Sequence, residues 1–259
     1  MSNKRNVIIV GGVAGGASCA ARLRRLDEEA EITIYEKGDY VSFANCGLPY
    51  RIGGIIQNDA ALVLTTPEEF WAKFRLDAKT KHEVISVDAH RKVVRVRNLR
   101  NGEEFEKNYT HLVLATGALA IRPPIPGLDL PGVFTVRTIP DTQRIRKWIE
   151  ENKVRKAVVA GGGFIGLEMA ENLKHLGLEV VVVEMAQQIL PPMDAEMVRP
   201  LERHVVNNGV KLVLGQPVTE ILKNGNSLLL KTKNGDHLPA DIVIIALGVR
   251  PDLTLAKSA

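Results

Sequence analysis

The sequence predicts an α/β fold made of two similar units, with a small β-meander inserted into the first. Residues 5–38 and 155–186 share one pattern: an apolar run, a glycine cluster, an amphipathic helical stretch, and a second apolar run ending in a glutamate. A later apolar run ends at a glycine turn in each unit, at 111–118 and 241–251. Because buried parallel strands are continuously apolar, these runs indicate two parallel sheets with crossover helices.

Composition sets broad limits on the kind of protein. A chain of 259 residues with 45% hydrophobic and 25% charged residues is typical of a globular protein with one large or two ordinary domains. The net charge of +4 comes without a long basic run, which argues against a nucleic-acid partner. Apolar runs such as 242–247 are too short to cross a bilayer, so no membrane partner is expected. Two cysteines cannot form a disulfide framework, which favours a reducing, cytoplasmic setting.

The glycine cluster of the second unit has the complete pattern of a dinucleotide-binding turn. Gly161, Gly163 and Gly166 fill G-x-G-x-x-G between an apolar run and a helical stretch. Such glycines permit a tight turn and let the backbone approach a pyrophosphate, which binds the amides at the helix amino terminus. Glu184 follows at about the distance at which an acid binds the ribose 2′-hydroxyl. No arginine follows it closely, so the pattern favours NADH over NADPH.

The first unit departs from this pattern at one position. Gly11 and Gly16 match, but Val13 stands where the middle glycine would allow the closest backbone approach. Glu36 follows at the expected distance, so a second dinucleotide site is predicted here. The alternative for both units is a Rossmann-like fold that binds nothing. Two copies, each with its acidic residue, make that alternative the weaker one.

The remaining elements follow from alternation, capping and turn signals. Alternating strands at 81–88 and 92–98 form the predicted meander. Four prolines mark 121–132 as a connector between domains, and a helix capped by Asp141 follows at 139–152. A helix with a proline interruption is predicted at 194–209. Three further strands are predicted at 211–215, 217–222 and 227–235, the last ending in an Asn-Gly turn.

The segment YVSFANCGLPY, residues 40–50, is the candidate for chemistry. Cys46 lies among small polar residues and can begin a short helical turn capped by Ser42 or Asn45. A helix amino terminus favours the thiolate, which is the nucleophilic form of cysteine. The alternative is a buried structural cysteine. Cys19 lies within the first predicted helix beside small residues and is interpreted as a packing residue.

The motifs together resemble a known family. The segments GGVAGGASCAARLRRL, EKGDYVSFANCGLPY, LVLATGA, RPPIPG, GGGFIGLEMAENL and ALGVRPD are similar to those of the pyridine nucleotide-disulfide oxidoreductases. Within that family the likeness is greatest to the single-cysteine branch of coenzyme A-disulfide reductases and NADH-dependent CoA-persulfide reductases. The resemblance implies the glutathione-reductase-like FAD/NAD(P) fold. The implied domains are 1–118 for FAD, 119–247 for NAD, and 248–259 as the start of the return to the FAD domain.

The resemblance also implies the cofactor contacts. Gly11, Gly16 and Glu36 match the segment that holds the FAD pyrophosphate and ribose, and Thr116 and Gly117 match a turn near the flavin. The NADH site is matched by Gly161, Gly163, Gly166 and Glu184, with Glu168 close to where nicotinamide stacks on flavin. Further implied cofactor contacts are Val13, Ala14, Gly15, Lys37, Val84, Ala115, Phe164, Ile165 and Gly248.

For the substrate, the resemblance makes Cys46 the redox cysteine. Its implied CoA contacts are Ser42 and Asn45 in the same loop, and Ser18, Arg22 and Arg25 on the first helix. For the two arginines, a solvated helix face is an equal alternative. With one reactive cysteine, the second sulfur must come from the substrate. The implied reaction takes electrons from NADH through FAD to a mixed disulfide between Cys46 and CoA.

Other readings stay open. One is an NADH oxidase or peroxidase in which Cys46 cycles through a sulfenic acid. Another is a non-catalytic nucleotide-binding fragment or a redox-sensing module. The six histidines show no ligand spacing, so no metal is expected. Family members continue well beyond residue 259, so the chain is expected to lack the last FAD segment and the dimerisation domain of a longer homodimer.

Overall fold

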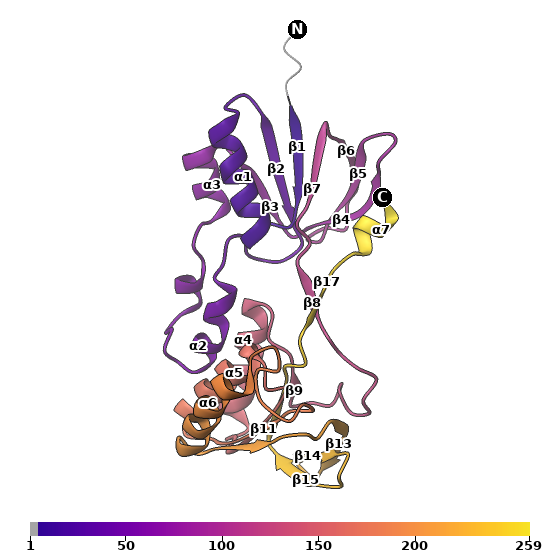
Figure 1. Ribbon diagram of the computed structural model, residues 1–259. Coiled ribbons are helices and arrows are strands. Elements are labelled where there is room, and N and C mark those ends of the chain that lie inside the picture. The colour runs from indigo at the N-terminus through magenta and orange to yellow at the C-terminus, as the bar shows by residue number, and fades with distance from the viewer. Residues whose placement is uncertain (1–4) are drawn as a thin grey trace. The chain divides into compact units, whose positions relative to one another are not determined.

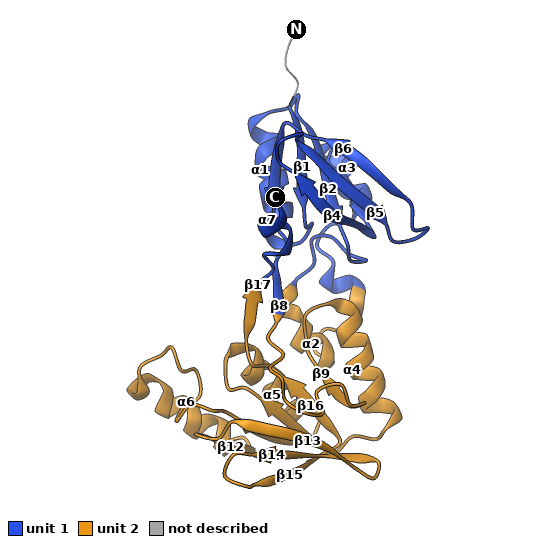
Figure 2. Ribbon diagram, turned by 90° about the vertical axis from the view of Figure 1, so that its right-hand side faces the viewer, with its two compact units in different colours: residues 1–44, 60–119, 251–259 blue, residues 45–59, 120–250 orange. Residues whose placement is uncertain are grey.

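The computed structural model describes residues 5–259, and the chain divides into two compact units (Figure 2). The first comprises Met1–Ala44, Ala60–Leu119 and Pro251–Ala259, and the second comprises Asn45–Asp59 and Ala120–Arg250. Residues 45–59, which the sequence-based division places in the first domain, therefore pack with the second unit. Which cofactor each unit holds remains a prediction.

Unit 1 is a parallel sheet with helices on one face and a meander on the other (Figure 1). Its strand order is β3-β2-β1-β7. Ile8 and Val10 of β1 pack against the meander, whereas Val7 and Ile9 pack against the helices. Both faces of β1 are therefore buried, which explains its unbroken apolar run. The elements are β1 (Asn6–Val10), α1 (Ala14–Leu26), β2 (Glu31–Glu36), α3 (Pro67–Phe74), β3 (Asp77–Thr80), β7 (His111–Leu114), and the meander strands β4 (His82–Asp88), β5 (Val93–Asn98) and β6 (Glu104–Asn108).

Unit 2 repeats this plan. Its five parallel strands have the order β12-β11-β10-β16-β9, and a second antiparallel meander covers one face. Val158 and Val243 of the sheet share a buried cluster with Leu228 and Leu230 of that meander. The elements are β9 (Val133–Phe134), α4 (Ile139–Glu151), β10 (Lys156–Ala160), α5 (Phe164–His175), β11 (Glu179–Val183), α6 (Ala195–Asn207), β12 (Val210–Val213), β16 (Ile242–Ile245), and the meander strands β13 (Val218–Asn224), β14 (Ser227–Thr232) and β15 (His237–Ala240).

Short elements complete the chain. Strands β8 (Ala118–Ala120) and β17 (Val249–Pro251) form a two-stranded sheet where the chain passes from one unit to the other. The last helix, α7 (Thr254–Ser258), belongs to unit 1, and its Leu255 packs against the cluster that includes Val84 of β4. The Thr116 hydroxyl donates to the carbonyl of Asp252 at 2.7 Å, which ties this returning segment to the turn after β7.

The fold class and the internal duplication are confirmed, and two local expectations are wrong. Helix α4 is capped by Thr138, whose hydroxyl accepts from the amide of Asp141, while the Asp141 carboxylate accepts from the Thr138 amide at 2.8 Å. Asp141 is thus the third helical residue of a capping box and not the cap. Helix α6 runs without interruption through Pro200. Pro200 lies in the second turn, so its missing amide removes one hydrogen bond close to the helix start and the later bonds remain.

The first and third glycines of each cluster are required by the fold itself. Gly161 has a φ of +113°, and a Cβ there would overlap the carbonyl oxygen of Ala246. Gly11 has a φ of +96°, and a Cβ there would overlap the carbonyl oxygen of Ala115. The middle position differs, because a Cβ on Gly163 would have no atom within 4 Å. That open space explains why unit 1 accommodates Val13 at the corresponding place.

A pair of substitutions tests this distinction. Gly161→Ala should lower the free energy of unfolding by at least about 2 kcal/mol, because it adds left-handed strain and a backbone clash. Gly163→Ala should change it by less than about 1 kcal/mol, because φ is −77° there and the space is open. Urea unfolding followed by circular dichroism measures both variants. Equal losses of unfolding free energy in the two variants would contradict the conclusion that the fold requires Gly161 but not Gly163.

Candidate functional site

Each glycine turn is fastened by the acidic residue at the end of the next strand. In unit 2, Glu184 accepts from the amide of Gly162 at 2.7 Å with one carboxylate oxygen and from that of Ala186 at 2.8 Å with the other. Its side chain is buried, with 7% of the residue exposed. The carboxylate therefore connects the turn after β10 to the turn after β11 and fixes their spacing.

Unit 1 has the same connection. Glu36 accepts from the amide of Gly12 at 2.8 Å and from that of Gly38 at 2.7 Å. The duplication therefore extends to individual hydrogen bonds, which the sequence pattern did not reveal. Each carboxylate oxygen retains a further acceptor site, so a ribose hydroxyl remains compatible with both glutamates.

The two helix amino termini fit the pyrophosphate of a dinucleotide. Helix α1 starts after Val13 and helix α5 after Gly163, and neither helix has a side-chain cap. The first-turn amides are therefore open to an anionic ligand. Ala14 and Gly15 are exposed at the start of α1, and Phe164 is exposed at the start of α5. The open space at Gly163 would allow a pyrophosphate to approach the backbone closely.

The other predicted cofactor contacts lie within the two units as follows. In unit 1, Lys37 lies after β2 with its ammonium 3.8 Å from Asp252, and the segment Ala115–Gly117 follows β7 at the same sheet edge as the glycine turn. The side chain of Val84 is buried in the core, so only its main chain can contact a ligand. In unit 2, Ile165 is half-buried in the first turn of α5. Gly248 has a φ of +97° and accepts from the amide of Ile121 at 2.9 Å.

The predicted CoA contacts divide between the units. Ser18, Arg22 and Arg25 are exposed on α1 of unit 1, an arrangement that suits either a CoA contact or a solvated helix face. Ser42 also belongs to unit 1, where its amide donates to the carbonyl of Gly12 at 2.8 Å. Asn45 and Cys46 belong to unit 2.

Cys46 lies near the start of a short segment of unit 2, residues 45–59, which we call the arm. A 3-10 turn (Asn45–Gly47) leads directly into helix α2 (Leu48–Ile52), which packs against α4 and α5. Cys46 is exposed, whereas Gly47 and Leu48 are buried. The expected cap is wrong: Gly47 is the N-cap, and no side chain caps α2, because the preceding 3-10 turn already continues into it. The exposure of Cys46 excludes a buried structural cysteine.

The second cysteine has a different environment. Cys19 is half-buried on α1 and packs against a cluster that includes Ile9 and Phe70. Cys46 is therefore the more accessible thiol.

Sequence reasoning missed the polar contacts that hold the arm. Arg51 donates to Asp59 at 2.6 Å, and Gln143 of α4 donates to the other carboxylate oxygen of Asp59 at 2.6 Å. Nothing in the local sequence links Asp59 to Gln143, because their contact depends on how the arm packs.

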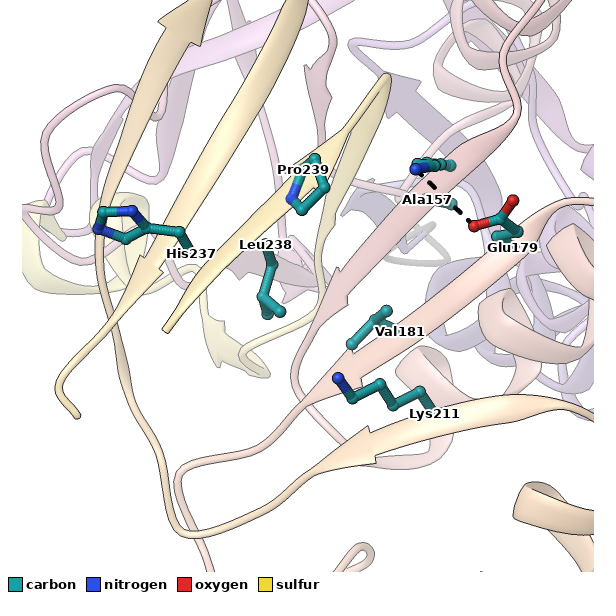
Figure 3. Close-up of a pocket in the computed structure, with 8 residues that line it drawn as sticks. Ala157, Glu179, Val181, Lys211, His237, Leu238 and Pro239 are labelled. Atoms are coloured by element: carbon teal, nitrogen blue, oxygen red, sulfur yellow. Dashed lines mark ion pairs between the residues drawn. The ribbon is translucent and has the colours of Figure 1, made fainter. Parts of the chain in front are cut away.

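Figure 3 shows a hollow in unit 2 that is remote from the glycine turns. It lies at the amino ends of β10 and β11, whereas the glycine turns follow the carboxyl ends, and its volume is about 220 Å³. The ammonium of Lys156 and the carboxylate of Glu179 are 4.0 Å apart at its edge, and His237 points away from Lys211 (Figure 3). The charged groups do not converge on one point, so the hollow is not a candidate active site.

Comparison with known proteins identifies the family. The sequence pattern of the pyridine nucleotide-disulphide oxidoreductases matches residues 5–259. The chain belongs to this family. Membership implies FAD and a nicotinamide nucleotide as cofactors, in agreement with the two dinucleotide-binding turns. Within residues 5–259, no helix is long and apolar enough to cross a membrane.

Relatives within the pyridine nucleotide-disulphide oxidoreductase family carry two kinds of name. An NADH oxidase of Methanocaldococcus jannaschii is 40% identical over 97% of this chain and 56% of its own length. A coenzyme A disulfide reductase of Staphylococcus aureus is 36% identical over 98% of this chain and 56% of its own length. The chain thus spans about half the length of the curated relatives it matches.

Solved structures of the family agree with the fold. The reduced Bacillus anthracis protein CoADR-RHD superposes with a TM-score of 0.96 at 45% identity, covering 99% of this chain and 46% of that one. An NAD-dependent persulfide reductase from A. fulgidus superposes with a TM-score of 0.92 at 39% identity, covering 97% of this chain and 47% of that one. The resemblance inferred from the motifs is therefore confirmed.

Glu168 has a perturbed carboxyl on α5. Partial burial raises its pKa above the ordinary value for glutamate, and the negative charge of Glu171 raises it further. Glu171→Gln should therefore lower the pKa of Glu168, although burial will keep it above the ordinary value. A carboxyl ¹³C NMR titration measures this change. Glu179→Gln, at the start of β11, is the control and should leave the pKa of Glu168 unchanged; equal titration curves for all three proteins would contradict the assignment.

Proposed function

We propose that the protein to which this chain belongs is an FAD-dependent oxidoreductase that passes electrons from NADH to Cys46. Its substrate would be a CoA disulfide, or a CoA persulfide or polysulfide. The observation that carries the proposal is the exposed thiol of Cys46 on a short arm of the unit whose α5 begins at a complete dinucleotide turn. Relatives named coenzyme A disulfide reductase and NAD-dependent persulfide reductase support this substrate class.

The chain's own residues would act as follows. The Cys46 thiolate attacks one sulfur of CoA disulfide, so that a Cys46–CoA disulfide forms, the CoA–CoA bond breaks and one CoA thiolate leaves. FAD, held by the Gly11–Gly16 turn and Glu36, would supply the two electrons from NADH that restore the thiolate. Ser42 and Asn45 would contact CoA beside the thiol, and Ser18, Arg22 and Arg25 would contact the rest of the CoA moiety.

The preference for NADH rests on Glu184. Both of its oxygens are fixed by backbone amides, so the negative charge stays at the place where an adenosine 2′-phosphate would lie. The segment that follows, Met185–Leu190, contains no arginine to neutralise that phosphate. We therefore expect NADH to bind more tightly than NADPH.

A second candidate function uses the same thiol. One relative, 40% identical, is named an NADH oxidase. In that reaction the Cys46 thiolate attacks a peroxide oxygen, the O–O bond breaks, and a sulfenic acid forms at Cys46 while water or hydroxide leaves. The same exposed position serves either substrate, so the products at Cys46 distinguish the two.

A mass measurement tests the substrate directly, without the need for cofactors. The 259-residue chain, incubated with CoA disulfide, should gain one CoA moiety at Cys46 and release one CoA thiol. Cys46→Ser should abolish the adduct, whereas the matched Cys19→Ser variant should form it at a rate within about twofold of the unchanged protein. Intact-mass spectrometry and peptide mapping give the site.

The result also separates the alternatives. A sulfenic acid with peroxide but no CoA adduct would favour the oxidase reaction. If neither product forms, the result would indicate a nucleotide-binding or redox-sensing module. Full NADH-dependent reduction of CoA disulfide or persulfide by the Cys46→Ser variant would disprove the proposed mechanism.

A further inference from the structure

We propose that Arg51, Asp59 and Gln143, together called the latch, are positioning residues that hold the Cys46 arm in one place on helices α4 and α5. The inference rests on the proposed function, because it assumes that Cys46 must meet a bound substrate in a fixed orientation. None of the three residues stands out in the sequence motifs. Their arrangement is visible only in the folded arm.

The latch connects the helix that follows Cys46 to the last residue of the arm. Arg51 lies in α2, directly after the 3-10 turn that contains Cys46, and Asp59 is the last residue of the arm. The Arg51 Nε donates to Asp59 Oδ1 at 2.6 Å, and the Gln143 Nε2 donates to Asp59 Oδ2 at 2.6 Å. In addition, Nη1 of Arg146 on α4 donates to the carbonyl of Arg51 at 3.1 Å. The carboxylate of Asp59 thus joins α2 and the end of the arm to α4.

The Arg51–Asp59 ion pair is less exposed to solvent than an ion pair on the surface of α4. The side chains of Arg51 and Asp59 are 13% and 26% exposed, whereas those of Lys147 and Glu151 on α4 are 72% and 64% exposed. Burial alone would raise the pKa of Asp59, but the hydrogen bonds from Gln143 and Arg51 lower it below its ordinary value. Asp59 is therefore charged at neutral pH. Its removal would leave a partly buried guanidinium uncompensated.

The other side of the arm rests on α5. Asn172 of α5 is fully buried, and its Nδ2 donates to the carbonyl of Glu168 at 2.8 Å. A Cβ at Gly53 would overlap the Oδ1 of Asn172. The arm therefore lies against α5 at a distance that only glycine permits. This is the helix that begins at the dinucleotide turn and carries Glu168.

The position of the Cys46 thiol therefore depends on how the arm packs against α4 and α5 of unit 2. Pro49, Ile52 and Gly53, which follow Cys46 in the arm, are buried, whereas Cys46 itself is exposed. If the packing of residues 47–53 were loosened, the thiol would stay accessible but would be free to move. A reaction that needs an oriented approach would then slow, whereas a reaction with a small reagent from any direction would not.

The experiment compares two reactions at Cys46 in latch variants and matched controls. The latch variants are Arg51→Met and Asp59→Asn. The controls, on the exposed pair of α4, are Lys147→Met and Glu151→Gln. For each protein, the rate of mixed-disulfide formation with CoA disulfide is divided by the rate of alkylation with iodoacetamide. Amide hydrogen exchange of residues 47–53 is measured on the same samples.

We expect each latch variant to lower the rate ratio at least tenfold and to accelerate amide exchange in 47–53, with both controls within twofold of the unchanged protein. Amide exchange that is accelerated throughout unit 2, and not selectively in 47–53, would indicate a merely destabilised fold and would overturn the proposal. Ratios and exchange equal to those of the controls would overturn the proposal.

Failure of the proposed function would look different. If the unchanged chain does not react with CoA disulfide, the proposed function is wrong and hydrogen exchange alone decides on the latch. Faster exchange of 47–53 in both latch variants would then still support it, and unchanged exchange would overturn it.

Discussion

The close approach between the first glycine of each cluster and the neighbouring strand is the constraint on which both units depend. Gly161 lies against the carbonyl of Ala246, and Gly11 lies against that of Ala115. This contact directs each helix away from the sheet edge with its amino terminus open. A buried or half-buried glutamate then fixes the next turn at the same edge. The sheet edge at which a dinucleotide is predicted to bind is thus shaped by contacts that the fold already requires.

The same reasoning separates structural from functional glycines. The fold needs glycine at the first and third positions, where a side chain would meet backbone. It has no need of Gly163, where the space is open, and a valine stands at the equivalent place in unit 1. Glycine at position 163 leaves open space at the start of α5, which is compatible with the predicted close approach of a dinucleotide. A motif match alone does not make this distinction.

Much of the fold was predictable because its signals are local. The paired glycine clusters, the apolar runs and the meander strands at 82–88 and 93–98 are written in short windows of sequence. The cap at Thr138, the continuity of α6 through Pro200 and the uncapped start of α2 depend on hydrogen bonds that several patterns could satisfy. The placement of 45–59 in unit 2 depends on contacts between residues far apart in the chain, such as Asp59 with Gln143 and the packing of α2 against α4 and α5. For the candidate site, the sequence therefore predicted Cys46 as the candidate thiol but not the contacts that hold the arm around it.

The proposed electron path can be tested most directly by counting thiols. The chain is loaded with FAD, converted to the Cys46–CoA mixed disulfide and mixed with one equivalent of NADH in the absence of oxygen. The proposed path predicts one CoA thiol released for each NADH oxidised, because reduction of one disulfide takes the two electrons of one hydride. Oxidation of NADH with no release of CoA would contradict it.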